Sequence, residues 1–134
     1  MNKAKLAGLA FVFIWFMGGG IGHFTHTEFF VNIMPPSFPL HYEAVYISGV
    51  FEILGALGLL FAAYRKWAGN GLILLTLCVT PANIHMWLNP QSFPEVPEFA
   101  LSVRLVIQVL LLACIWWCTR PDIERPTTQA HAVR

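Results

Sequence analysis

Two ionisable residues, Glu52 and Arg104, interrupt apolar stretches that are long enough to cross a membrane. A charge at the centre of a membrane-spanning helix costs at least about 2.5–3.5 kcal/mol on insertion scales, so such residues usually face the protein interior and pair. Glu52 lies nine residues from Glu43, and Arg104 lies six from Glu98, which corresponds to depths of about 14 Å and 9 Å in their helices. An arginine side chain spans the difference of about 5 Å. We therefore expect a Glu52–Arg104 ion pair or a shared polar network.

Further polar residues lie at helical spacing around this pair. Ser48 precedes Glu52 by four residues and Gln108 follows Arg104 by four, so each shares a helix face with its ionisable neighbour. Asn83 lies in another apolar stretch, at a depth similar to that of Arg104. The residues expected to form a buried polar network or to bind a ligand are His23, Ser48, Glu52, Asn83, His85, Arg104 and Gln108. Because buried polar groups also hold membrane helices together, a packing role and a functional role both fit this pattern.

The composition indicates which elements position these residues. Hydrophobic residues make up 57% of the 134 residues and charged residues 11%, against roughly 25% charged residues in soluble domains. A soluble domain of this size could not bury so much apolar surface, because small domains have a high surface-to-volume ratio. Four stretches reach the roughly 20 helical residues that a hydrocarbon core of about 30 Å requires, at about residues 6–22, 42–64, 68–88 and 99–118. The expected fold class is therefore all-α, a polytopic membrane protein with a bundle of four transmembrane helices.

The segments around these spans differ in character. We expect a transmembrane domain over residues 1–120 and a flexible cytoplasmic tail at residues 121–134, which are mostly polar. A tight turn is expected at residues 65–67, so that the second and third spans form an antiparallel hairpin. The outer loop between the first and second spans, residues 23–41, is apolar and proline-rich. We expect this loop to fold back over the outer mouth of the bundle.

The basic residues outside the spans predict the orientation of the chain. These residues are Lys3, Lys5, Arg65, Lys66, Arg120, Arg125 and Arg134. The loops at residues 23–41 and 89–97 contain neither Lys nor Arg. By the positive-inside rule this partition places both termini in the cytoplasm, and the expected location is a bacterial inner membrane. The net charge of +1 gives no argument for nucleic-acid binding.

Several histidines near the outer ends of the spans raise the question of a metal or a haem. His23, His26, Glu28 and His41 are weak candidates for a metal site of mixed nitrogen and oxygen ligands, but their spacing is not a structural-zinc pattern. A bis-histidine haem would require two inward histidines at matched depth, for which the candidates are His23 and His85. A quinone suits the polar layer better than a metal or a haem does, although no cofactor follows from the residues alone.

The order of these features resembles the DoxX-like family of small four-helix integral membrane proteins. The segments that carry the resemblance are residues 22–24, the proline-rich residues 34–39, residues 46–55, Arg65, residues 81–86, and residues 104–108. The resemblance implies a four-helix membrane bundle. Some relatives are linked to quinone-coupled thiosulfate oxidation or oxidative-stress complexes and others act as assembly factors, so the fold alone does not define an activity. The chain lacks the paired cysteines of thiol-handling relatives, which argues against disulfide exchange.

Two functions are compatible with these observations. The first is a redox-linked subunit that binds a quinone or a similar lipophilic molecule in the outer half of the bundle, where Arg104 could stabilise an oxygen that gains negative charge on reduction. The second is a non-catalytic membrane scaffold or assembly factor for a larger complex. The chain contains no self-contained catalytic motif, so at most it is a subunit of a membrane oxidoreductase. The expected partners are the lipid bilayer and either other membrane or periplasmic subunits or further copies of this chain.

Overall fold

Helices account for most of the described chain. The computed structural model describes residues 1–123, so most of the tail predicted at residues 121–134 lies outside the described residues. The elements are α1 (Lys3–Thr25), α2 (Thr27–Asn32), α3 (His41–Leu59), α4 (Arg65–Leu88), the 3-10 helix η1 (Pro90–Ser92) and α5 (Glu98–Thr119). Four of them, α1, α3, α4 and α5, are long and apolar enough to cross a membrane. The predictions of an all-α fold and of four membrane-length helices are therefore confirmed, and the chain is an integral membrane protein.

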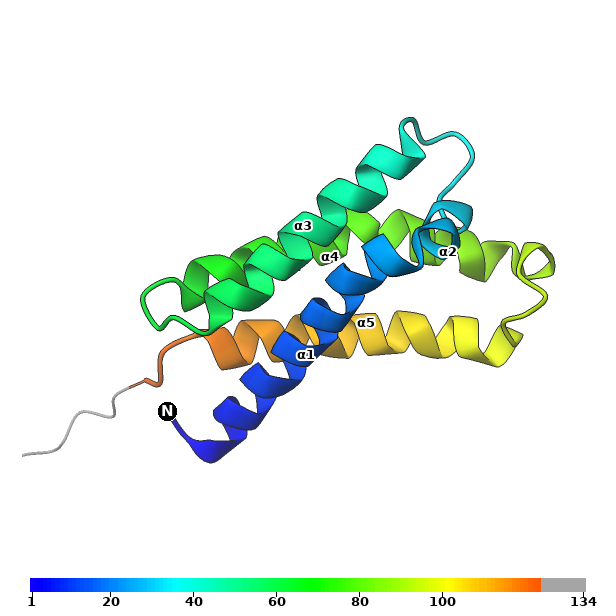
Figure 1. Ribbon diagram of the computed structural model, residues 1–134. Coiled ribbons are helices and arrows are strands. Elements are labelled where there is room, and N and C mark those ends of the chain that lie inside the picture. The colour runs from blue at the N-terminus through cyan, green and yellow to red at the C-terminus, as the bar shows by residue number, and fades with distance from the viewer. Residues whose placement is uncertain (124–134) are drawn as a thin grey trace, which may run out of the picture.

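The four long helices pack in a ring (Figure 1). Helix α1 packs against α3 and α5, and α4 packs against the same two helices. The helices α3 and α5 therefore lie diagonally across the bundle. The short helix α2 contacts α1 and α3 at one end of the bundle, which we call the α2 end. The chain begins at the other end (Figure 1), which we call the terminal end.

Glycines allow α1 and α3 to cross closely near the middle of the bundle. A Cβ atom on Gly20 would lie 2.7 Å from Cγ1 of Ile53 and 3.0 Å from the carbonyl oxygen of Gly49. A Cβ atom on Gly49 would lie 2.8 Å from Cβ of His23. Small residues at such a crossing let the two backbones approach, which is a common device in membrane helix packing. The crossing fixes which faces of α1 and α3 point into the bundle.

The connection between α3 and α4 comes earlier than the sequence predicted. Helix α3 ends at Leu59, residues 60–64 form the turn, and Arg65 begins α4. The turn expected at residues 65–67 is therefore wrong, and the second span is shorter than residues 42–64. The turn residues are apolar, so hydropathy does not distinguish them from a continuing helix. The Arg65 side chain marks the helix end instead, because its Nε donates a 2.9 Å hydrogen bond to the Leu59 carbonyl oxygen.

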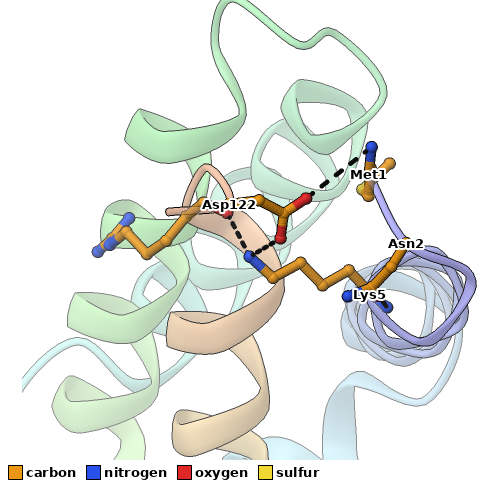
Figure 2. Close-up of polar contacts among 5 residues, drawn as sticks. Met1, Asn2, Lys5 and Asp122 are labelled. Carbon is orange, nitrogen blue, oxygen red and sulfur yellow. Dashed lines mark hydrogen bonds and ion pairs between the residues drawn. The ribbon is translucent and has the colours of Figure 1, made fainter. Parts of the chain in front are cut away.

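The terminal end is fastened by a polar cluster, which we call the terminal latch (Figure 2). The Nζ atom of the buried Lys5 lies 2.8 Å from Oδ1 of Asp122 and donates a 2.9 Å hydrogen bond to the carbonyl oxygen of Arg120. The amino group of Met1 lies 3.9 Å from the same carboxylate. The hydrogen bond from Lys5 holds the pKa of Asp122 below its usual value. The latch joins the first turn of α1 to the segment after α5.

Loop residues are packed into the α2 end. Ile33, Met86 and Leu101 are buried together, so the segment after α2 contacts α4 and α5 through its apolar side chains. The Tyr42 hydroxyl donates a 2.6 Å hydrogen bond to Oε1 of Glu28 and links α2 to α3. These contacts attach α2 and the residue that follows it to α3, α4 and α5 at the α2 end.

Candidate functional site

A cavity of about 720 Å³ lies in the half of the bundle nearer the α2 end. All four long helices, α2 and the loop after α2 contribute to its lining. The polar or ionisable residues that line it are His23, Ser48, Glu52, Thr76, Asn83, Arg104 and Gln108. Cavities that bind small molecules usually measure about 300–1,000 Å³ and combine apolar walls with a few polar groups. This cavity therefore has the size and the composition of a ligand site.

Every residue predicted for the site except His85 lines this cavity. His85 follows Asn83 by two residues, which is about 200° around an α-helix, so the two side chains point to different faces of α4. The His85 ring packs edge-on against Phe93 with centroids 6.1 Å apart, and Nδ2 of Asn89 lies 3.3 Å from its Nδ1. The prediction that His85 shares a site with Asn83 is therefore wrong.

On one side of the cavity, a chain of hydrogen bonds joins α4 to α5. Nη2 of Arg104 donates to Oδ1 of Asn83 at 3.0 Å, and Nδ2 of Asn83 donates to Oε1 of Gln108 at 2.5 Å. Nε2 of Gln108 then donates to the Thr80 hydroxyl at 2.6 Å, and this hydroxyl donates to the Thr76 carbonyl oxygen at 2.9 Å. The side chain of Arg104 is therefore held in place by a continuous polar network.

On the opposite side, His23 and Glu52 lie where α1 crosses α3. Nδ1 of His23 lies 2.7 Å from the Gly19 carbonyl oxygen. Because a carbonyl oxygen only accepts, Nδ1 donates this bond, and Nε2 of the neutral imidazole is left as an acceptor. Oε2 of Glu52 is 3.6 Å from Nδ1, too far for a hydrogen bond. The His23 ring also stacks on Phe30 with centroids 4.0 Å apart.

The expected ion pair between Glu52 and Arg104 is not formed, since no nitrogen of Arg104 lies within 4 Å of the Glu52 carboxylate. The rise per residue predicts depths within an arginine's reach for the two residues, but α3 and α5 lie diagonally in the bundle and the cavity separates the two side chains. The hydrogen-bond network of Arg104 does not extend to Glu52 either. Both residues nevertheless line the same cavity.

Two buried polar atoms of the cavity lining lack a hydrogen-bond partner within residues 1–123. They are Oε2 of Glu52 and Nε of Arg104. The side chain of Glu52 is only 8% exposed. An unpaired buried polar group costs roughly 1–3 kcal/mol, and more if the group is charged. The two unpartnered atoms are themselves fully buried, so a headgroup in the cavity would meet the other polar atoms of Glu52 and Arg104, which both line it.

The apolar part of the lining is rich in aromatic rings, namely Trp15, Phe16, Phe29, Phe30 and Phe38. Sequence reasoning did not single out these residues, because aromatic residues are frequent throughout the chain and show no spacing that points to one site. Sequence reasoning did not identify Gly19 and Gly20 as points of close approach either, because the helix that they contact becomes evident only from the packing.

The weak metal candidates do not come together. Within residues 1–123, no group of three or more His, Cys, Asp or Glu side chains is placed to hold a metal ion. Nδ1 of His26 is hydrogen-bonded to the Thr25 hydroxyl, Glu28 accepts from Tyr42, and Nε2 of His41 lies 3.2 Å from the Pro35 carbonyl oxygen. His23 and His85 do not share the cavity, so they do not form a pair for a haem.

The fold and the cavity define a small all-α integral membrane protein with a cavity lined by apolar side chains and a few polar ones. The chain belongs to the family described as a domain of unknown function, DUF8561, whose family model matches residues 12–119. The matched region contains the entire cavity lining, from Ile14 to Leu111. No curated protein matches the chain, and no solved structure matches it.

Proposed function

We propose that this protein is a DoxX-like membrane subunit of an oxidoreductase, and that it binds a quinone or a similar lipophilic molecule inside the bundle. The observation that carries the proposal is the cavity of about 720 Å³ in which Glu52 and Arg104 each retain an unpartnered polar atom. The aromatic lining suits a flat ring, and the apolar surroundings suit a hydrocarbon tail.

The polar residues supply the chemistry that a bound quinone would require. The Arg104 guanidinium, oriented by Asn83, stabilises negative charge that develops on an oxygen during reduction. Glu52 and His23 are groups that exchange protons, and both line the cavity. In this proposal a partner subunit or a soluble donor supplies or removes the electrons.

The proposed location is a bacterial inner membrane with both termini in the cytoplasm. The basic residues Lys3, Lys5 and Arg120 lie at the terminal end, and Arg65 and Lys66 begin α4 directly after the α3–α4 turn, in agreement with the positive-inside rule. The α2 end then faces the periplasm, and the apolar loop with its prolines forms the outer cap of the cavity. Resemblance to DoxX-like proteins supports the same arrangement.

Protection of a native cysteine tests the proposal. Cys78 is exposed and lines the cavity, whereas Cys114 and Cys118 do not line it. A bound short-chain quinone such as decylubiquinone should therefore slow maleimide labelling of Cys78 in purified protein, as followed by mass spectrometry. The Arg104→Leu variant should require at least about tenfold more quinone for the same protection, since it loses an interaction of about 1.4 kcal/mol or more. Glu52→Gln should not weaken quinone binding, because a carboxylate oxygen and a quinone oxygen both only accept hydrogen bonds.

The matched control is Glu43→Gln. It makes the same chemical change on α3 at an exposed residue that does not line the cavity, so its protection should equal that of the wild type. Thermal unfolding of each variant verifies that the helices remain folded. Equal protection in the wild type and Arg104→Leu would contradict the proposal.

One observation favours the second candidate, a scaffold or assembly factor. The network from Arg104 to Thr76 lies entirely between α4 and α5, and a purely structural helix contact would have this form. Under this function the cap at the α2 end is a docking surface for another membrane or periplasmic subunit. A stable protein partner recovered from crosslinked native membranes, together with no quinone protection of Cys78, would favour the scaffold.

A further inference from the structure

We propose that the cavity selects a headgroup with an aromatic hydroxyl, a lipophilic phenol or hydroquinone, whose O–H donates to Glu52 and whose oxygens accept from Arg104. The inference rests on the proposed function, because it assumes that the cavity binds a lipophilic ring. It adds the hydrogen-bonding character of that ring, and with it the redox form that the site prefers.

The wall formed by α1 and α3 offers acceptors. Glu52 contributes carboxylate oxygens: Oε2 is buried against Gly19, and Oε1 accepts no hydrogen bond within residues 1–123, so it is the oxygen available to a ligand. His23 uses Nδ1 to donate to the Gly19 carbonyl oxygen, so its Nε2 is an acceptor in the neutral ring. The helix crossing holds both groups in place, since a Cβ atom on Gly19 would lie only 2.9 Å from Oε2 of Glu52. A ligand satisfies this wall by donating a hydrogen bond.

The wall formed by α5 offers a donor. The guanidinium of Arg104 carries five N–H groups and no acceptor. Its Nη2 donates to Asn83 and its Nε is fully buried, while Nη1 donates no hydrogen bond within residues 1–123 and is available to a ligand. The amide nitrogens of Asn83 and Gln108 already donate within the α4–α5 network. A ligand satisfies this wall by accepting a hydrogen bond from Arg104.

A single ligand class meets both requirements. A carbonyl oxygen accepts but cannot donate, so a quinone satisfies Arg104 and leaves Glu52 buried and unpaired. A hydroxyl group donates once and accepts as well, and a hydroquinone carries two such groups on opposite sides of one ring. Because α3 and α5 face each other diagonally across the cavity, a ring with polar groups at its edge fits between the two walls.

The aromatic side chains favour a ring over an aliphatic alcohol. Phe30 is already stacked on His23, and Trp15, Phe29 and Phe38 also line the cavity. Aromatic pairs contribute about 0.5–1.5 kcal/mol beyond the area that they bury. The ring edge therefore carries the hydroxyl groups to the two walls while the ring faces contact the aromatic lining.

A pair of probes that differ by one hydrogen-bond donor tests the inference. 4-Butoxyphenol and its methyl ether, 1-butoxy-4-methoxybenzene, both carry a second oxygen at the opposite edge of the ring that can accept from Arg104. Each is titrated against the folded protein in detergent, with concentrations expressed as mole fractions in the micelle. Binding is read from the protection of Cys78 against maleimide. The phenol should bind the wild type and Glu43→Gln at least about tenfold more tightly than the ether, because the ether cannot donate to Glu52.

Two variants test which wall of the cavity takes part in each hydrogen bond with the ligand. In Glu52→Gln the preference for the phenol over the ether should fall to less than about threefold, since the charged acceptor is gone. In Arg104→Gln both probes should bind more weakly, and their ratio should remain near the wild-type value. Micelle partitioning of a probe is the same for every variant, so these changes in ratio report on the site.

The outcomes separate the inference from the proposed function. If both probes protect Cys78 equally in the wild type, the inference fails while the proposed ligand site stands, and Glu52 then acts as a protonated donor. A preference that disappears in Arg104→Gln and persists in Glu52→Gln also overturns it, because the phenol would then bind as a phenolate. If neither probe nor decylubiquinone protects Cys78, both the inference and the proposed function fail. The wild-type ratio remains decisive even if a variant does not fold.

Discussion

A structural role and a functional role for Glu52 predict opposite effects of the Glu52→Gln substitution on the melting temperature. Its side chain is 8% exposed, Oε2 has no hydrogen-bond partner, and His23 is too distant to donate to it. A residue retained for packing would be expected to have its polar atoms satisfied, as those of Asn83 and Gln108 are. A carboxylate without a partner destabilises the empty protein and is available to a ligand.

The first prediction therefore concerns Glu52→Gln in the ligand-free protein. The neutral amide has nearly the same shape and is less costly to bury than an unpaired carboxylate, so stability should rise by about 1 kcal/mol. The melting temperature in detergent, measured by circular dichroism after lipophilic ligands have been removed, provides the test. The exposed Glu43→Gln should leave the melting temperature unchanged. A clear fall in the melting temperature of Glu52→Gln would assign Glu52 a structural role.

At the scale of the elements, the α1–α3 crossing positions the acceptor wall of the cavity. The backbones approach at Gly20 and Gly49, and this approach brings His23 and Glu52 to the same level. Helices α4 and α5 are instead joined by long polar side chains. The two halves of the site thus depend on different packing devices, small residues on one side and hydrogen bonds on the other.

The second prediction compares two alanine substitutions on α1. Gly20→Ala places a methyl group 2.7 Å from Ile53 and 3.0 Å from the backbone of Gly49, whereas a Cβ on Gly18 meets nothing within 4 Å. Gly20→Ala should destabilise the protein by about 1–3 kcal/mol through overpacking. Gly18→Ala should be neutral or stabilising, because it lowers backbone entropy in the unfolded chain. Thermal unfolding of both variants is the measurement, and equal stability would show that the crossing is not tightly packed.

At the scale of the whole molecule, the terminal latch closes the bundle at the end opposite the cap of the cavity. It joins residues that are more than a hundred positions apart, through the contact of Lys5 with Arg120 and Asp122. Helix α1 is therefore held at both ends, by the latch at its start and by the glycine crossing further along. The cavity is lined by all four long helices and lies nearer the α2 end of the bundle than the terminal latch does.

The third prediction is a pH dependence of the latch. The hydrogen bond from Lys5 lowers the pKa of Asp122 in the folded protein, so this carboxylate stabilises the fold at pH values above its usual pKa. The stabilisation is lost as the pH falls through the lowered pKa. The wild type should therefore melt at a higher temperature than Asp122→Asn near neutral pH, and the difference should shrink as the pH falls below about 4. A difference that stays constant with pH would show that Asp122 does not act through its charge.

The amino-acid sequence alone predicts the four membrane-length helices and the ionisable residues that must face the interior of the bundle. Lipid requires long apolar helices, and it makes a residue such as Glu52 or Arg104 costly unless it is buried. Which polar side chains come into contact depends on how the helices pack, and this is evident only from the tertiary structure. Depth along a helix follows from the rise per residue, but the neighbours of a helix depend on side-chain packing, and the crossing at Gly20 placed α3 beside α1 and diagonal to α5. Glu52 and Arg104 therefore face each other across a cavity where a direct ion pair was expected.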